Sequence, residues 1–253
     1  MPRWHLLPRR PVQAHPAEVL HSRYPELSVS HDRLWSGGLD GLRSVSFDLD
    51  GTYADTSRDL AGALNALRVE LGQDPLPVPD VARFVGRGAR WLVTNCVDRL
   101  TCDAVESQVL RFLDLYTDCC TDTTAPYAGL DALVADLRDR GLRVSIATNK
   151  PRRYTEAIID GLGWEGHFDS VHCGDDGPSK PDPAMLEASI RAAESTPETH
   201  LHVGDTPTDA EAAARIGCLF APVFWGMDGG EALRDRCSQG FSETSDLIRA
   251  FEG

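Results

Sequence analysis

Carboxylates, hydroxyls and lysines recur in four short segments of this 253-residue chain. The segments are Asp48-Leu49-Asp50-Gly51-Thr52, Thr148-Asn149-Lys150, Ser179-Lys180-Pro181-Asp182-Pro183 and Gly204-Asp205-Thr206-Pro207-Thr208-Asp209. The chain has only two lysines against 23 arginines, and both lysines fall inside these segments. We expect each segment to lie at the carboxyl end of a strand.

Four aspartates of these segments would repel one another if the fold brought them together without a cation. They are Asp48, Asp50, Asp205 and Asp209. A set of oxygen ligands without His or Cys indicates Mg²⁺, which keeps some of its waters for a phosphate-bearing substrate. Lys180 would supply a compact positive charge for a phosphoryl oxygen. The pattern therefore predicts Mg²⁺ as cofactor and a small phosphorylated molecule as substrate.

Alternating strands and helices must position these segments. Residues 44–49 predict a strand, and Thr56 as N-cap with Asp59 three residues later predicts a helix over 56–71. After Pro126 we expect strands over 143–148, 169–173, 199–204 and 218–225, with helices over 128–140, from Pro151, and over 182–194 and 208–216. This order is typical of an α/β fold with a doubly wound parallel sheet, whose strands end at one shared edge.

The strand pattern divides the chain into three parts. Residues 1–43 are rich in Pro and weakly periodic, and we expect a poorly ordered N-terminal extension. Residues 44–56 and 126–253 are predicted to form the catalytic core. The pattern of residues 57–125 predicts helices and no strand, and we expect these residues to form a helical cap. Because this insert follows the first strand, it would lie as a lid over the carboxyl end of the sheet.

The composition excludes several classes of partner. The chain has 39 acidic against 25 basic residues, a formal net charge of −14, which disfavours nucleic acid and anionic membrane surfaces. The seven cysteines form no C-x-x-C pair, and no apolar run has the length of a membrane helix. These features predict a cytoplasmic protein that is a monomer or a small homo-oligomer.

The four segments, in this order, resemble the motifs of the haloacid dehalogenase (HAD) superfamily, and within it the phosphoglycolate phosphatase-like group with a helical cap. The resemblance covers residues 44–253. The separations are 100 residues from Asp48 to Thr148, 32 from there to Lys180 and 25 from there to Asp205. The resemblance implies a Mg²⁺-dependent phosphatase acting on a small phosphomonoester, with 2-phosphoglycolate as the first candidate.

The resemblance also implies roles for individual residues. Asp48 would be the nucleophile that forms an aspartyl-phosphate, and Asp50 the general acid and base. Phosphoryl oxygens would be held by Thr148, the amide of Asn149 and Lys180. The metal would be bound by Asp48, the backbone carbonyl of Asp50 and Asp205, with Asp209 holding the metal's waters or the lysine. Gly51 would let the chain turn toward the cap.

Some residues keep two interpretations. Lys150 either faces the phosphate or is the solvated residue before Pro151. Arg87, at a helix start in the cap, either binds a substrate carboxylate or is an exposed helix residue. Tyr53 departs from the aliphatic residue usual after the first motif, so it could touch the leaving group. His172, His200 and His202 are interpreted as core residues.

Other functions use related chemistry. A dehalogenase needs no acid at position 50, so Asp50 disfavours that branch. A phosphomutase of the β-phosphoglucomutase type and a pyrophosphatase would keep the same core and stay open. A receiver domain also has a phosphoacceptor Asp, but it lacks the Asp-x-Asp pair and the inserted cap, so a receiver-like phosphoacceptor is disfavoured. No P-loop or G-x-G-x-x-G motif is present.

Overall fold

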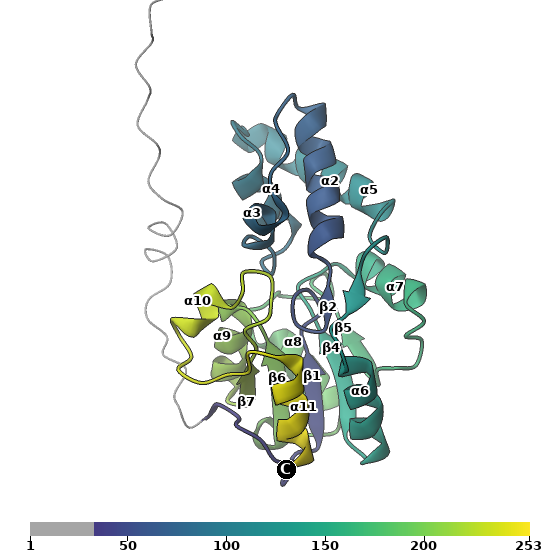
Figure 1. Cartoon of the computed structure of the whole chain (residues 1–253), viewed down its shortest axis with the longest axis vertical. Coiled ribbons are helices and arrows are strands. Elements are labelled where there is room, and N and C mark those ends of the chain that lie inside the picture. Colours follow the sequence, from purple (N-terminus) through teal and green to yellow (C-terminus); the bar gives the residue numbers. More distant parts are fainter. Residues whose placement is uncertain (1–32) are drawn as a thin grey trace, which may run out of the picture.

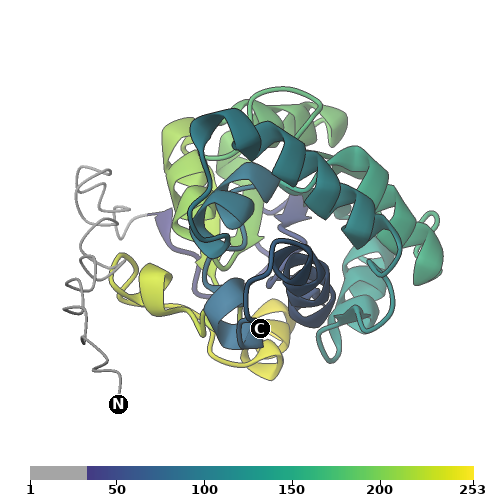
Figure 2. The same ribbon diagram turned by 90° about the horizontal axis from the view of Figure 1, so that it is seen from above.

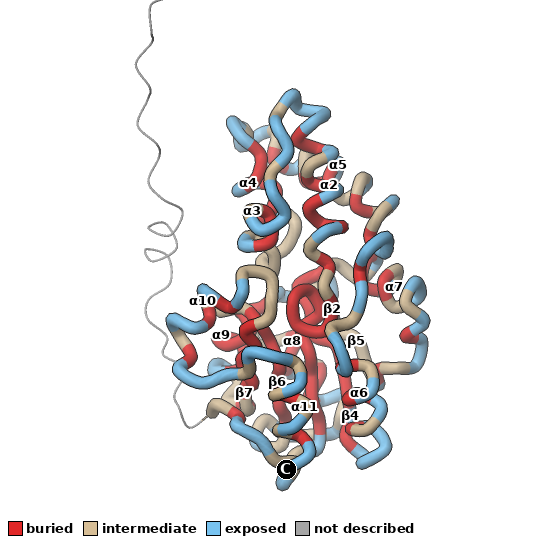
Figure 3. Tube along the Cα trace, viewed as in Figure 1, coloured by how far each residue is buried: buried red, intermediate tan, exposed pale blue. Residues whose placement is uncertain are grey.

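A five-stranded parallel sheet forms the centre of the computed structural model, which describes residues 33–253. Its strands are β1 (Ser44–Phe47), β4 (Arg143–Ala147), β5 (Ser170–His172), β6 (His200–Gly204) and β7 (Leu219–Pro222). The spatial order is β5-β4-β1-β6-β7, and β1 pairs with β4 on one side and β6 on the other. Strands β1 and β6 are buried along their whole length, whereas the helices alternate between buried and exposed stretches (Figure 3).

Helices cover both faces of this sheet (Figure 1). Helices α6 (Leu130–Asp139) and α11 (Thr244–Glu252) share an apolar cluster with Val45 and Phe47 of β1. Helices α8 (Ala184–Ala192) and α9 (Pro207–Ile216) belong to a second cluster, which includes Phe220 of β7. The remaining core helices are α7 (Arg152–Gly161), the short α10 (Glu231–Arg234) and the 3-10 turn η3 (Pro197–Thr199). The predicted α/β fold class is thus confirmed.

The inserted helices stand over the carboxyl ends of the strands (Figures 1 and 2). They are α2 (Ser57–Glu70), α3 (Val78–Ala82), α4 (Ala89–Cys96), the 3-10 turn η2 (Cys102–Ala104) and α5 (Val105–Thr117). They bury an apolar cluster of their own, which includes Leu64, Leu67, Leu92 and Phe112. Because these side chains recur at helical spacing, each helix turns one apolar stripe toward its neighbours.

Two linkers join the cap to the core. β2 (Ala54–Asp55) and β3 (Ala125–Pro126) pair antiparallel, a short ribbon that the sequence did not predict. Beside it, the buried Asp59 carboxylate accepts hydrogen bonds from the backbone N–H and the hydroxyl of both Thr123 and Thr124. The start of α2 is therefore tied to the chain segment that returns from the cap.

Thr56 differs from its expected role. It occupies the N-cap position of α2, but its side chain makes no capping bond, and Asp59 is engaged with Thr123 and Thr124. The Thr56 hydroxyl instead donates to Asp50 Oδ1 at 2.6 Å. An N-cap hydroxyl would accept from a backbone N–H of the first helical turn, whereas here it donates to the buried carboxylate of Asp50.

The predicted N-terminal extension of residues 1–43 needs a correction where the structure describes it. Residues 1–32 lie outside the described part. From Leu34 on, the chain runs along β7: Leu34 bridges to Phe220, and the Trp35 N–H donates to the Phe220 carbonyl. The Trp35 ring is 7% exposed and lies 4.4 Å from the ring of Phe251 in α11. The described part of the extension is therefore an ordered edge of the core, because the large apolar ring of Trp35 is buried there.

Candidate active site

Asp48 follows β1 directly, and the chain then turns sharply toward the cap. Gly51 has a φ of +87°, and a Cβ at this position would lie 2.5 Å from Asp205 Oδ2. Only glycine fits both the backbone conformation and the close approach. The turn thus brings the loop after β1 against the loop after β6.

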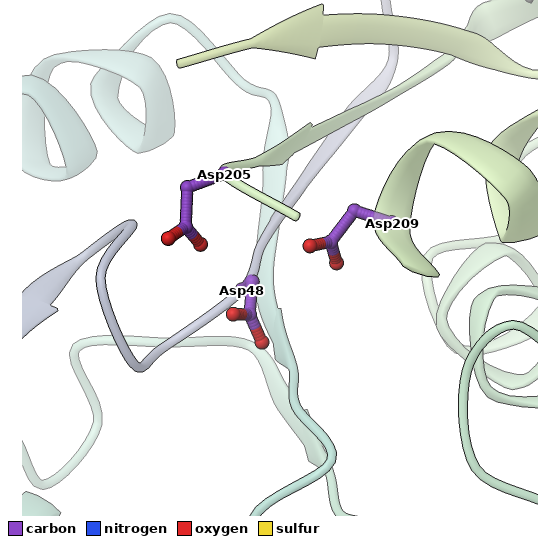
Figure 4. A group of neighbouring side chains, drawn as sticks. All are labelled: Asp48, Asp205 and Asp209. Carbon is purple, nitrogen blue, oxygen red and sulfur yellow. The ribbon is translucent and has the colours of Figure 1, made fainter. Parts of the chain in front are cut away.

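Three carboxylates from these loops converge in one buried space (Figure 4). Asp48, Asp205 and Asp209 each offer an oxygen that lies within 4.8 Å of the others, and each is at most 4% exposed. Burial raises the pKa of Asp205, and the charges of Asp48 and Asp209 raise it further. Burial raises the pKa of Asp48, Lys180 lowers it and Asp209 raises it, for a net pKa of about 7. Unbalanced negative charge in a set of oxygen donors fits a small hard cation.

Asp205 is held by contacts that the sequence motifs did not predict. Its Oδ1 accepts from the Thr52 hydroxyl at 2.8 Å, and its Oδ2 accepts from the Met227 N–H at 3.2 Å. A Cβ on Gly226 would lie 2.1 Å from the same Oδ2. Thr52 lies within the first motif and was therefore discoverable, whereas Met227 and Gly226 belong to a loop after β7 that carries no motif.

Lys180 lies at the centre of a buried ion-pair network. Its Nζ donates to Asp48 Oδ1 at 2.8 Å, to Asp209 Oδ1 at 2.6 Å and to the Ala147 carbonyl at 2.6 Å. Burial lowers the pKa of Lys180, but the charges of Asp209 and Asp48 raise it more, so the ammonium stays charged. All three ammonium protons have acceptors, so its position is fixed.

Asp209 is saturated with hydrogen bonds. Oδ1 lies 2.6 Å from Lys180 Nζ and 3.0 Å from His202 Nε2, and Oδ2 accepts from the N–H and hydroxyl of Thr206. Thr206 and Asp209 form the capping box that begins α9. Burial raises the pKa of Asp209, but Lys180 and His202 lower it more, so the carboxyl is ionised. Because a carboxylate has about four acceptor sites, of the two roles expected for Asp209 the structure favours holding the lysine over holding the metal.

The Asp50 side chain lies apart from the carboxylate cluster. Its Oδ1 accepts from the Thr56 hydroxyl at 2.6 Å and from Lys150 Nζ at 2.8 Å. These bonds engage Oδ1 of the side chain, and the metal contact expected of Asp50 is through its backbone carbonyl. The contact also rules out the interpretation of Lys150 as a solvated residue, because the side chain is buried.

Thr148 and Asn149 follow β4 at the same edge. The Thr148 hydroxyl accepts from the Lys150 N–H at 3.2 Å and lines the cavity between core and cap. The Asn149 side chain donates to the carbonyls of Gly86 and Lys180 and accepts from the Lys180 N–H. Both amide protons of the side chain are thus used to join the cap to the lysine loop, so a phosphoryl oxygen could be bound there only by the backbone N–H.

A cavity of about 50 Å³ lies between the cap and the core. Asp48, Asp50 and Lys150 contribute its core wall, and Leu92 and Tyr116 are among the residues of its cap wall. A volume of this size holds roughly four waters or a small polar group. The cap therefore leaves only a small space beside Asp48 and Asp50.

Arg87 and Tyr53 do not reach this cavity. Gly86 and Gly88 line it, but the Arg87 guanidinium lies 4.9 Å above the ring of Trp91. Tyr53 is fully buried in the core, and its hydroxyl donates to Asp131 at 2.6 Å. The expectation that Tyr53 touches a leaving group is corrected, because its ring is enclosed by core aromatics that the local sequence cannot show.

Comparison with known protein families agrees with this geometry. Residues 45–223 match the family model described as haloacid dehalogenase-like hydrolase. The chain belongs to this family. The resemblance inferred from the four motifs is thereby confirmed, and the hydrolase is an enzyme.

Relatives of the hydrolase include named phosphatases. It is 33% identical to the phosphoglycolate phosphatase of Caulobacter vibrioides, over 76% of this chain and 80% of the relative. It is 34% identical to the N-acetylmuramic acid 6-phosphate phosphatase of Pseudomonas aeruginosa, over 74% of this chain and 89% of the relative. The fold matches that of a predicted phosphoglycolate phosphatase from Haemophilus somnus with a TM-score of 0.76 at 23% identity, over 84% of this chain and 99% of that one.

Within residues 33–253, no helix is long and apolar enough to cross a membrane.

Proposed function

We propose that the hydrolase is a Mg²⁺-dependent phosphatase that cleaves a small phosphomonoester, with 2-phosphoglycolate as the best candidate. The observation that carries the proposal is the buried network of Asp48, Lys180 and Asp209 beside Asp205, which lies next to a small cavity under the cap. This arrangement provides a nucleophile, a fixed cation and a small enclosed space for the substrate.

In the first step, a carboxylate oxygen of Asp48 attacks the phosphorus atom. The bond from phosphorus to the ester oxygen breaks, and Asp50 gives its proton to the leaving alkoxide. Lys180 lies 2.8 Å from Asp48 and balances negative charge that would otherwise repel the phosphoryl group. Thr148 and the backbone N–H of Asn149 would donate to the phosphoryl oxygens.

In the second step, water hydrolyses the aspartyl-phosphate. Asp50, now ionised, accepts a proton from the water as its oxygen attacks phosphorus, and the bond to Asp48 breaks. Inorganic phosphate is released, and Asp50 is again protonated for the next turnover. The hydrogen bonds from Thr56 and Lys150 keep the Asp50 carboxyl facing the cavity through both steps.

The carboxylates of Asp48 and Asp205, with the backbone carbonyl of Asp50, would hold Mg²⁺. When bound, the ion would neutralise the phosphoryl group and orient it for attack. Thr52 and Met227 fix the Asp205 carboxylate for this purpose, and the glycines at 51 and 226 leave room for it. Asp209 would act on the site through Lys180.

Two lines of support favour a small substrate. The cavity between the cap and the core is small, about 50 Å³, which favours a small leaving group. Several relatives carry the name phosphoglycolate phosphatase, at 29% to 34% identity. N-acetylmuramic acid 6-phosphate is the second candidate because of the Pseudomonas aeruginosa relative, but it would require the cap to open.

Phosphate release from a panel of phosphate compounds tests the proposal. The panel contains 2-phosphoglycolate, N-acetylmuramic acid 6-phosphate, glucose 1-phosphate and pyrophosphate, each with Mg²⁺ and with a chelator. We expect turnover of 2-phosphoglycolate that depends on Mg²⁺ and is abolished in Asp48→Asn but retained in the control Asp114→Asn, an exposed acid of α5. Equal turnover by Asp48→Asn would overturn the nucleophile, and conversion of glucose 1-phosphate to an isomer without phosphate release would indicate a mutase.

The cysteines support a cytoplasmic location for this activity. All seven carry free thiols, and five of them are buried. Burial raises the pKa of Cys96 and Cys218 to about 12, so these thiols stay protonated. Free thiols persist in the reducing cytoplasm.

A further inference from the structure

The cavity wall contains a buried tyrosine hydroxyl next to a lysine. Among residues 33–253, the Tyr116 hydroxyl is the one buried side-chain polar atom without a hydrogen bond of regular geometry, and it interacts with the ammonium of Lys150. Tyr116 lies on α5 of the cap, lines the cavity and is 1% exposed. Nearly all buried polar groups are hydrogen-bonded, so this hydroxyl can donate its proton to a group that occupies the cavity.

A buried cation lies next to this hydroxyl. Lys150 Nζ is 4.7 Å from the centre of the Tyr116 ring and 2.8 Å from Asp50 Oδ1. An ammonium has three donors, and Asp50 accepts one of them. Burial lowers the pKa of Lys150, but Asp50 raises it more, so the group is charged. Lys150 and Tyr116 thus offer charged and neutral donors on the leaving-group side of Asp50.

The rest of the cap wall is apolar. Leu60 and Leu92 contribute to it, together with Phe112. These side chains offer no hydrogen bond, so Lys150 and Tyr116 are the side-chain donors beside Asp50 that remain for an anion on the leaving group. A carboxylate has two oxygens and matches two adjacent donors, and bonds to charged groups are the stronger ones.

We propose that Lys150 and Tyr116 form a subsite for a carboxylate carried by the leaving alcohol. This inference rests on the proposed phosphatase function and deepens it, because it names the substrate class as phosphorylated 2-hydroxy acids. It also replaces Arg87, whose guanidinium lies over Trp91, as the cation for the second anion.

The subsite couples binding to the first chemical step. Asp50 must carry a proton in order to give it to the leaving oxygen when the P–O bond breaks. In that state Lys150 loses its anionic partner, and the substrate carboxylate supplies another. The carboxylate therefore stabilises the form of the enzyme in which Asp50 is a neutral acid.

A pair of substrates that differ only in the carboxylate tests this subsite. We compare kcat/KM for 2-phosphoglycolate with that for ethyl phosphate, in which a methyl group replaces the carboxylate. The wild type should prefer 2-phosphoglycolate by about 100-fold, and Tyr116→Phe should reduce this ratio about 10-fold, the effect of one hydrogen bond to a charged group. The matched control is Tyr154→Phe, which alters a cavity hydroxyl already bonded to the Leu113 carbonyl and should keep the ratio.

The outcomes separate the two claims. If the wild type releases phosphate from neither compound nor from the wider panel, the proposed function fails. If the wild type is active but shows equal kcat/KM for the pair, or if Tyr116→Phe keeps the wild-type ratio, the carboxylate subsite is overturned and the phosphatase stands. Lys150→Met should lower the ratio of kcat/KM for the two compounds and also the turnover of both, because the Lys150 side chain contacts Asp50.

A second, independent observation concerns the buried polar side chains of β1 and β6. Ser44 Oγ is 2.7 Å from His200 Nδ1, and His200 Nε2 is 2.9 Å from Ser46 Oγ. Ser46 Oγ is 2.8 Å from His202 Nδ1, and His202 Nε2 is 3.0 Å from Asp209 Oδ1. All five side chains are at most 1% exposed. A continuous polar chain thus crosses the core and ends at the carboxylate that holds Lys180.

The ionised carboxylate sets the direction of every bond in this chain. It can only accept, so His202 Nε2 must carry the proton and Nδ1 must accept from Ser46. The Ser46 oxygen then accepts from His200 Nε2, and His200 Nδ1 accepts from Ser44. Burial lowers the pKa of both histidines, which agrees with one proton on each ring.

From this order we infer that His202 is a positioning residue. It restrains Asp209 Oδ1, the oxygen that also binds Lys180 Nζ, and so aims the ammonium at Asp48. Histidine is suited to the place because its two nitrogens bond in opposite directions along one line. Residues interpreted as core histidines thereby act on the site through Asp209.

Tautomers and kinetics test the positioning role. Nitrogen NMR of labelled histidine should show His202 and His200 protonated at Nε2 alone, whether or not the protein is active. His202→Phe should lower kcat by about 10-fold or more with little change in KM, and His202→Gln, which keeps an N–H donor, should recover most of it. An Nδ1 proton on His202, or equal kcat in the two variants, would overturn the inference.

Discussion

At the scale of the residue, Lys180 shows why its charge alone is insufficient. Its Nζ has acceptors at 2.6 to 2.8 Å on three sides, and the side chain is 1% exposed. A guanidinium is planar and larger, so it cannot reach the same three atoms from one point. The chain uses arginine nearly everywhere else, which makes the exception informative.

We predict that Lys180→Arg lowers kcat by about 100-fold or more although the charge is retained. Lys180→Met, which removes the charge, is the comparison variant. Steady-state kinetics with thermal unfolding separates loss of chemistry from loss of fold. An Arg variant with more than half of the wild-type kcat would contradict this account of the site.

Gly51 makes a second prediction at this scale. Gly51→Ala should destabilise the protein by about 2–4 kcal/mol, because it combines a positive φ with a clash against Asp205. Gly41 is a matched control, since its φ is +82° and a Cβ there meets nothing within 4 Å. Chemical denaturation should show a clearly smaller loss for Gly41→Ala. Equal losses of unfolding free energy in Gly51→Ala and Gly41→Ala would mean that the clash with Asp205 adds nothing.

At the scale of the element, Asp59 connects the two linkers of the cap. It accepts from two backbone N–H groups and two hydroxyls of residues 123 and 124. Burial raises the pKa of Asp59, but the bonds from Thr123 and Thr124 lower it more. A carboxyl with a lowered pKa stabilises the fold above its ordinary pKa, and this contribution is lost as the pH falls.

We therefore predict that Asp59→Asn destabilises the protein by about 2–4 kcal/mol at neutral pH. The gap in unfolding free energy between wild type and variant should narrow as the pH falls below the ordinary carboxyl pKa of about 3.9, because the unfolded chain then takes up a proton that folded Asp59 resists. Urea unfolding across this pH range measures the difference in unfolding free energy, with the exposed Asp114→Asn as control. A gap that does not change with pH would rule out the ionised carboxylate as the cause.

At the scale of the whole molecule, the site is organised at the expense of stability. Asp48 and Asp205 are buried side by side, and burial together with neighbouring charges raises the pKa of both. A carboxyl with a raised pKa that is forced to ionise destabilises the folded state at neutral pH. A bound cation would offset this, since a ligand of the folded state alone stabilises it.

Asp48→Asn should consequently raise Tm in chelator by about 2–4 °C, since each kcal/mol moves Tm by that amount in a protein of this size. The wild type should gain Tm when Mg²⁺ is added, and the variant should lose most of that gain. Calorimetry with and without Mg²⁺ checks both, with the exposed Asp139→Asn of α6 as control. A lower Tm for Asp48→Asn in chelator would refute the idea.

Much of the core and the candidate site was predictable because its signals are local. Each strand of the sheet is followed within a few residues by its polar group, so Asp48, Thr148 and Asp205 could be placed at one edge from the strand pattern alone. The helices after Pro126 were predicted up to α9 because their apolar residues recur at helical spacing. Three features were not predicted: helix α11, the β2–β3 ribbon and the burial of Trp35. Each depends on contacts with residues distant in the sequence.

The amino-acid sequence by itself determined the family, the parallel sheet and the residues able to do the chemistry. Only the tertiary structure decided what each of them touches: Asp50 contacts Lys150, Asp209 is saturated by its neighbours, and the Tyr116 hydroxyl lies next to Lys150. The physical reason is the range of the interactions. Strand and turn patterns depend on neighbours along the chain, whereas the partner of a buried polar atom is set by segments about 100 residues away, as with Asp50 and Lys150.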